Sequence, residues 1–265
     1  GIGESSVLRG HSRSFAQPPF DLWISLLRNY GGITKVSPKS KGVPMGKFQK
    51  LFLGAGEPGR ALEESFDLLS GLMNLEEHGE PGSGEDMKKL HRKTMLAIRN
   101  FVRAFASGNP AILILESMEN CDPASLEALR FTVENCHIPE PLMILLITRN
   151  PGSPALDEFG TDYFKHHGID LEPLDETDRR EVIREITGSD IPDKAVDWIS
   201  MRSAGNPFYL IELVRYLVDS GRLEKTANGW SLNGLETESV PDSLSGLIRS
   251  RVDRMDPVMR RVLQY

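Results

Sequence analysis

The sequence predicts an α/β fold in which a parallel sheet carries helices on both faces. Ala111–Leu115 is an unbroken apolar run, too short for a core helix and typical of a strand buried on both sides. Asp122-Pro123 then begins a helix, with the carboxylate as N-cap and proline at the first helical position. A second apolar run, Leu142–Thr148, follows that helix, and such alternation of helix and strand is typical of a parallel sheet.

Composition excludes several classes of protein. A length of 265 residues suits one large domain or two medium ones. The net charge of −7 and the pI of about 5.5 argue against a surface built mainly to hold nucleic acid, although a local basic face is compatible with them. Two cysteines, Cys121 and Cys136, form no CxxC motif, and the six histidines show no metal-ligand spacing. No apolar run approaches the ~20 residues that span a bilayer, and no signal peptide precedes the first strand, so we expect a soluble, cytoplasmic protein.

The first half of the chain is expected to hold helices around the sheet. Val7–Arg9 predicts a short strand, and Pro18-Pro19 opens a helix that Gly31-Gly32 closes. Thr34–Lys47 is basic and broken by proline and glycine, which favours a solvated loop over a phosphate site. Two further helices are expected over Ala61–Leu75 and Met87–Ala106.

Helices dominate the chain after Arg149. We expect a short strand at Ile169–Leu171 and a helix over Thr177–Ile186 that Asp175 caps. Asn228-Gly229 predicts a hairpin turn. The remaining helices are expected after Pro192, over Phe208–Asp219, over Ser243–Met255 and over Pro257–Gln264. The sequence stops inside the last of these, so we expect it to be a piece of a longer protein.

The order of several segments resembles one family. They are ILILESMENCDPASLEAL, LMILLITRNPG, IDLEPLDETDRREVI, SAGNPFYLIELVRYLVDSG and VPDSLSGLIRSRVDRM, and the most specific are DPASLE at Asp122–Glu127 and GNPFYLIEL at Gly205–Leu213. From Val7 onward the chain resembles the AAA-type ATPase module of the STAND class, which is found beside adenylate/guanylate cyclase, kinase and LuxR-type regulator domains. That family is a nucleotide-dependent signalling switch.

The resemblance implies a division into three parts. Residues 1–165 would form a P-loop NTPase-like core, residues 166–222 a helical lid, and residues 223–265 a hairpin and the start of a winged helix. ATP or ADP and Mg²⁺ would be the cofactors. The partners would be an attached output domain of cyclase, kinase or LuxR type and other proteins, with no membrane. Nucleic acid is not expected as a partner of this fragment, because the recognition helix of a winged helix would lie beyond Tyr265.

The phosphate loop departs from the family pattern. Gly1-Ile2-Gly3-Glu4-Ser5 is similar to the family's GIGKS, which makes Gly1 and Gly3 the candidate phosphate-binding residues. Glu4 stands where the lysine belongs, and a carboxylate repels phosphate. Only three residues separate Gly3 from Val7, which leaves no room for the helix that should follow. Either that helix is deleted, or residues are missing from the sequence, or these are leftover terminal residues. In each case we do not expect normal ATP binding from this chain alone, although a glycine-rich loop with lysine upstream of Gly1 would restore the case for an ATPase.

The resemblance places Glu116 and Ser117 at the family's acid pair, the Walker B position. Glu116 would then be the ligand of Mg²⁺ and the catalytic acid. Ser117 cannot act as a carboxylate base and is a weak ligand for a hard cation, so we expect slow hydrolysis. The structural alternative is that Glu116 simply ends the strand at the sheet edge and binds no ligand.

Other candidate nucleotide-binding residues follow the next strand and lie in the second half of the chain. Thr148-Arg149 matches the polar sensor position near the γ-phosphate, and a salt bridge from Arg149 to Glu116 is the alternative. Gly205-Asn206-Pro207 resembles the family's GxP motif, in which proline packs on the adenine; the alternative is ordinary punctuation between two helices. Glu212, on the helix that follows, is expected to be a surface charge.

The leading hypothesis for function is a nucleotide-dependent regulatory module of a larger multidomain protein, weak or inactive as an ATPase. A nucleotide-free scaffold that keeps only the fold, and an ATPase-linked transcription regulator, are the alternatives.

Overall fold

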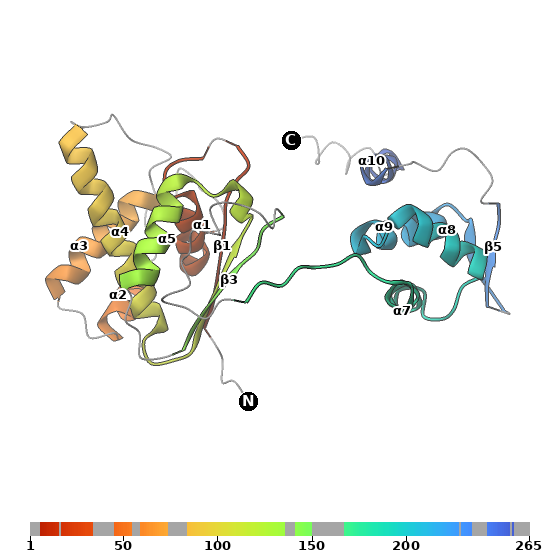
Figure 1. Ribbon diagram of the computed structural model, residues 1–265, viewed down its shortest axis with the longest axis horizontal. Helices are drawn as coiled ribbons and strands as arrows, with labels where there is room; N and C mark the ends of the chain where they lie inside the picture. Colours follow the sequence, from red (N-terminus) through yellow and green to blue (C-terminus); the bar gives the residue numbers. More distant parts are fainter. Residues whose placement is uncertain are drawn as a thin grey trace. The chain divides into compact units, whose positions relative to one another are not determined.

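The computed structural model describes residues 6–15, 17–33, 45–54, 59–73, 84–135, 141–149, 167–227, 229–234, 243–254 and 256. The chain divides into two compact units, Gly1–Gly168 and Ile169–Tyr265. Figure 1 shows the elements of each unit, which we take in turn.

The first unit is built on a three-stranded parallel sheet. Its strands are β1 (Ser6–His11), β2 (Ala111–Glu116) and β3 (Leu142–Leu146), in the order β1-β2-β3. The register sets Leu8 opposite Leu113, and Leu113 opposite Ile144. The predicted α/β fold with a parallel sheet is therefore confirmed, and the apolar run that begins at Ala111 forms the central strand.

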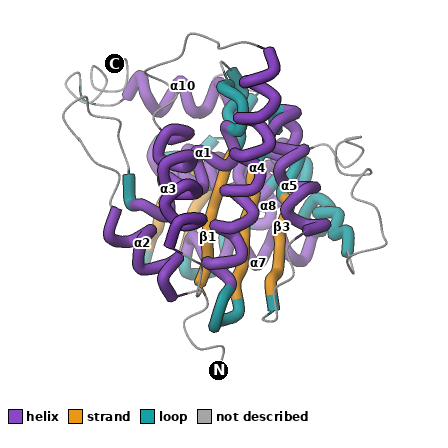
Figure 2. Tube along the Cα trace, turned by 90° about the vertical axis from the view of Figure 1, so that its left-hand side faces the viewer, coloured by secondary structure: helices purple, strands orange, loops and turns teal. Residues whose placement is uncertain are grey.

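The helices of this unit cover one face of the sheet. They are α1 (Asp21–Gly31), α2 (Met45–Gly54), α3 (Gly59–Met73), α4 (Gly84–Ala106) and α5 (Pro123–Asn135). Figures 1 and 2 show α1, α4 and α5 on the same side of the strands. Both crossovers, β1 to β2 and β2 to β3, advance in the same direction across the sheet, and right-handed crossovers of that kind place their helices on one face. The prediction of helices on both faces is thus wrong for the described part of the sheet.

The two faces of the sheet differ in exposure. Side chains alternate along a strand, and on the helix side Leu8 is 5% exposed and Leu113 0%, while the β3 residues of that side are half-buried. On the other side Val7 is 45% exposed and Met143 56%. We call this side the open face; it comprises Val7, Arg9, Ile112, Ile114, Glu116, Met143, Leu145 and Ile147.

Aromatic rings fill the core between the helices. Phe101 of α4 is fully buried, and its ring centre lies 5.2 Å from that of Tyr30 and 5.9 Å from that of Phe48. Burial raises the pKa of the Tyr30 hydroxyl. Phe48 and Phe52 belong to α2, which the sequence did not predict; the expected loop over Thr34–Lys47 is wrong from Met45 onward, because two buried phenylalanines outweigh the basic composition before them.

The second unit is a helical assembly with a small hairpin. It comprises α7 (Glu176–Thr187), α8 (Asp193–Ser203), α9 (Pro207–Asp219), β4 (Leu223–Thr226), β5 (Gly229–Leu232) and α10 (Leu244–Arg254). Leu210, Leu213 and Leu217 of α9 are fully buried in its core. Asp175 accepts a hydrogen bond from the Asp178 amide at 2.8 Å, which confirms the predicted cap of α7.

One predicted strand of the second unit is absent. Ile169–Leu171 is not paired with any strand of the described residues, and Ile169 and Leu171 are 80% and 93% exposed. A strand requires a neighbour to receive its backbone hydrogen bonds, and the β4-β5 hairpin pairs only with itself. The alternation of apolar and polar residues in this segment is therefore not enough to form a strand.

Among the described residues, no helix has both the length and the hydropathy that a membrane span requires.

Replacing Phe101 by alanine should destabilise the first unit by about 3–5 kcal/mol, because the substitution leaves a cavity in the aromatic core. Hydrogen exchange measured by mass spectrometry should show faster exchange in α4 and α1. The matched control is Phe208→Ala in the second unit, where the ring is 52% exposed and its loss should cost little. Equal exchange in Phe101→Ala and the unchanged chain would contradict this account of the core.

Candidate functional site

The carboxyl ends of the strands meet at one edge of the sheet. The ladder continues past the strands, since the Ser12 amide donates to the Glu116 carbonyl at 3.1 Å and the Met118 amide donates to the Ile147 carbonyl at 3.0 Å. After Glu116 the chain turns through Ser117, whose φ of 58° is left-handed, into the 3₁₀ helix η1 (Met118–Asn120). The candidate residues after β2 and β3 are therefore neighbours at this edge.

Glu116 lies half-buried on the open face, and its side chain makes no hydrogen bond or ion pair with any described residue. Its carboxylate is available to an external cation or donor. The described residues contain no group of three or more His, Cys, Asp or Glu side chains that could hold a metal ion. A cation at Glu116 would therefore take most of its ligands from a bound molecule or from water.

Thr148 and Arg149 are joined to Glu119, a residue that the sequence did not single out. The Glu119 carboxylate accepts from the Arg149 amide at 3.2 Å and from the Thr148 hydroxyl at 3.5 Å, and the Arg149 Nε lies 3.6 Å from its other oxygen. The alternative that paired Arg149 with Glu116 is wrong. The turn at Ser117 carries Glu119 back to the end of β3, and no sequence spacing indicates such a turn.

The pKa of Glu119 reflects these contacts. Its side chain is 12% exposed, and burial alone would raise the pKa. Backbone hydrogen bonds and the Arg149 charge outweigh burial, so the pKa is lowered from its ordinary value. The ionised form of Glu119 is thus part of the folded edge.

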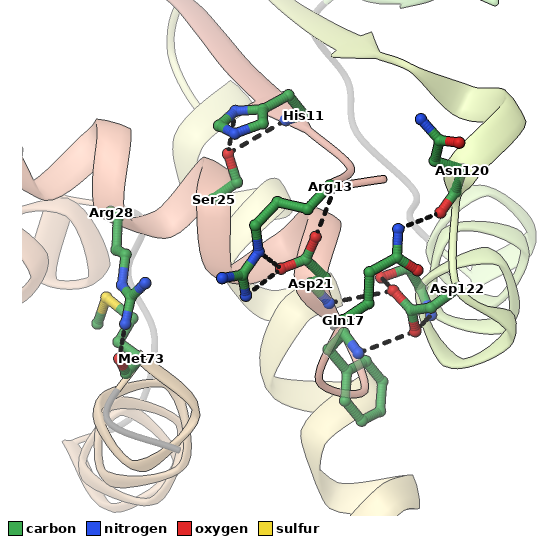
Figure 3. Close-up of polar contacts among 11 residues, drawn as sticks. His11, Arg13, Gln17, Asp21, Ser25, Arg28, Met73, Asn120 and Asp122 are labelled. Atoms are coloured by element: carbon green, nitrogen blue, oxygen red, sulfur yellow. Dashed lines mark hydrogen bonds and ion pairs between the residues drawn. The ribbon is translucent and has the colours of Figure 1, made fainter. Parts of the chain in front are cut away.

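Asp122 is the most heavily bonded carboxylate of the site. One oxygen accepts from the amides of Phe20 at 3.0 Å and Ser125 at 2.9 Å, and the other accepts from the Asp21 amide at 3.1 Å and from the Ser125 hydroxyl. Figure 3 shows these bonds converging on one side chain. The predicted N-cap of α5 is confirmed, and the same carboxylate also binds the amides at the start of α1.

The segment before α1 is held by a second carboxylate. Asp21 accepts from the Arg13 amide at 2.9 Å and from the Arg13 Nε at 2.7 Å (Figure 3). Phe20 has a φ of 66°, a costly conformation for a bulky residue, and it lies between these two contacts. The indole of Trp23 donates to the Ser125 carbonyl at 3.1 Å. These bonds give the DPASLE motif a structural role.

Cys121 precedes Asp122 and is not a candidate nucleophile. Burial raises the pKa of its thiol to about 12, with the nearby carboxylates of Asp122 and Asp21 adding to the shift and hydrogen bonds opposing it. The thiol therefore stays protonated at neutral pH.

Gly205, Asn206 and Pro207 each have a structural role within the second unit. Gly205 has a φ of 78°, and a Cβ there would lie 2.7 Å from the Cβ of Pro173 and 2.9 Å from the carbonyl oxygen of Leu174. The Asn206 side chain caps α9 by accepting from the Tyr209 amide at 2.9 Å, and Pro207 is the first residue of that helix. The chain thus needs these residue types whether or not an adenine is bound.

Glu212 is not the surface charge that the sequence suggested. It is 7% exposed, and its carboxylate accepts from Arg215 at 3.1 Å. It lies next to Leu213 and two residues from Leu210, both fully buried, so a charged residue at this position needs its cationic partner.

A hollow of about 360 Å³ opens between α7 and α8 of the second unit. Its cations are already matched with carboxylates, since Arg180 lies 3.0 Å from Asp193 and Arg184 lies 2.8 Å from Asp190. This hollow therefore offers no unpaired charge to an anionic ligand.

The predicted site residues are only partly brought together. Glu116, Ser117, Thr148 and Arg149 share one edge of the first unit, whereas Gly205–Pro207 belong to the second. Gly1 and Gly3 lie outside the described residues. In addition, the order β1-β2-β3 never reverses, so the described sheet lacks the switch point at which open α/β sheets bind ligands.

Comparisons with family models and with curated proteins do not identify a relative of the chain. No family model matches the chain, and no curated protein matches it either. The fold that the structure shows is an α/β unit with a three-stranded parallel sheet, followed by a helical unit with a hairpin.

Replacing Asp122 by alanine should destabilise the first unit by about 3 kcal/mol or more, because it leaves several buried donors without an acceptor. Asp175→Ala is the matched control; it removes a cap from one exposed helix start and should cost about 1 kcal/mol. Urea unfolding followed by hydrogen exchange measures both. If Asp122→Ala lowered the free energy of unfolding no more than Asp175→Ala does, the start of α1 would not depend on the Asp122 carboxylate.

Acid should weaken the edge of the sheet through Glu119. Because its folded-state pKa is lowered, its contribution to stability is present above the ordinary pKa of 4.5 and is lost as the pH falls through the folded value. Glu119→Gln should therefore be less stable than the unchanged chain at neutral pH and lose less stability on acidification. Glu134→Gln, on the exposed side of α5, serves as the control. If the free energy of unfolding fell in the same way on acidification in all three proteins, the role of Glu119 would be refuted.

Proposed function

We propose that this chain is a nucleotide-responsive regulatory module of the STAND-class AAA type within a larger multidomain signalling protein. Support comes first from Glu116, which combines a position at the tip of the central parallel strand with a carboxylate that has no partner among the described residues. Hard cations such as Mg²⁺ prefer carboxylate oxygens. In this proposal Glu116 ligates the Mg²⁺ of a bound ATP or ADP.

Slow turnover is part of the proposal. Ser117 occupies the position of the second acid and supplies no carboxylate to activate water. Thr148 and Arg149, the proposed sensor residues, are held by Glu119 and would have to leave it to reach a γ-phosphate. The module would therefore report which nucleotide is bound and hydrolyse it slowly or not at all, and an attached cyclase, kinase or LuxR-type domain would receive the signal.

A nucleotide-free scaffold is the second candidate, and a specific observation favours it. Asp122, Gly205 and Asn206 lie in the two most specific motifs of the resemblance, and each makes contacts that the fold itself requires. A chain that had lost its nucleotide would still need them. The fold would then serve as a surface for other proteins of the same assembly.

Isothermal titration with Mg-ATP and Mg-ADP separates the two candidates. The regulatory module predicts micromolar binding, which Glu116→Ala weakens by about tenfold in the presence of Mg²⁺ and leaves unchanged with EDTA. Glu134→Ala is the control for loss of a glutamate from the surface of the first unit. Absence of heat at millimolar nucleotide would refute the module and favour the scaffold. ATP turnover that Glu116→Ala leaves unchanged would exclude Glu116 as the catalytic acid.

A further inference from the structure

The open face of the sheet is unusual for its strand type. Parallel sheets are normally covered on both faces, because their strands are apolar on both sides. Here Leu145 and Ile147 are 37% and 44% exposed, and Val7 and Met143 are more exposed still. Ile112 and Ile114 of the central strand lie between them and are only half-buried. Removing this apolar patch from water would stabilise whatever complex covers it.

Two charges stand on this face without partners. Arg9 of β1 and Glu116 of β2 make no hydrogen bond or ion pair through their side chains with any described residue. Arg9 lies opposite Ile114, so Glu116 is displaced from it by one strand and two residues. Standard strand dimensions put their Cα atoms roughly 8 Å apart. The face thus carries one cation and one anion beside an apolar surface.

We propose that the open face binds the open face of a second copy of this chain. The two copies are related by a two-fold axis that lies in the plane between the two sheets. The axis passes over the midpoint between Arg9 and Glu116 and is perpendicular to the line that joins them. Each Arg9 then lies over Glu116 of the second copy. On the register of the sheet, the same rotation brings Ile114 against Ile114 of the second copy and Val7 against its Ile147. The strands then cross steeply, as in orthogonal sheet packing.

Charge complementarity selects a second copy as the occupant. A surface with one cation and one anion is complementary to its own rotated image, and a symmetric contact uses each ion pair twice. The two ion pairs would fix the orientation, while the apolar residues would supply most of the stabilisation. The inference goes beyond the proposed function and does not depend on nucleotide binding.

Sedimentation velocity of the whole chain, without nucleotide or Mg²⁺, tests this interface over a range of concentrations. The unchanged chain should form a dimer. Arg9→Glu and Glu116→Arg should each weaken dimerisation by about tenfold or more, because each sets like charges against one another. The double variant Arg9→Glu/Glu116→Arg should recover to within about threefold of the unchanged chain, since both pairs are restored with reversed sign.

Leu145→Glu tests the apolar part of the interface and should give monomers. Its matched control is Leu90→Glu, in which a leucine of α4 with 48% exposure is replaced away from the open face, and the dimer should persist. Circular dichroism establishes that every variant is folded. A chain that is monomeric at all concentrations, a dimer that survives Leu145→Glu, or a double variant as weak as the single reversals would each overturn the proposal.

Discussion

The arrangement of the first unit depends on the hydrogen bonds of one buried carboxylate. Asp122 lies directly after the turn that ends the central strand and binds the amides at the starts of α1 and α5. Two helices that are about a hundred positions apart in the sequence are thereby fixed to the same end of the sheet. The left-handed conformation of Phe20 is maintained by the same contact. A longer or uncharged side chain would not satisfy these donors together.

Short sequence patterns were sufficient to predict part of this structure. A short apolar run gave the central strand, and the cap residues Asp122, Asp175 and Asn206 act where helix starts were expected. These features depend on a few adjacent residues, which is why they were predictable. The helix at Met45–Gly54 was not, because Phe48 and Phe52 form it by burial against distant elements. The partnership of Glu119 with Arg149 depends likewise on a tight turn.

The one-sided cover of the sheet has a topological origin that no single segment reveals. The expected strand at Ile169–Leu171 and the expected second helical layer both presuppose a larger sheet whose strand order reverses. With three strands in monotonic order, right-handed connections put every helix on one side. Glu116 therefore lies both at the carboxyl end of β2 and on the open face of the sheet. Any ligand or protein that reaches one of these surfaces changes the surroundings of the same carboxylate.

Gly205 shows that a short sequence motif can be required by the fold alone. Its backbone approaches Pro173 and Leu174 so closely that selection for folding alone would remove any side chain at this position. Retention of the Gly-Asn-Pro triplet therefore follows from the architecture of the helical unit and is no evidence of a bound nucleotide. Glu116 makes no side-chain contact that the fold requires, so variation at this residue is the better test of the proposed cation site.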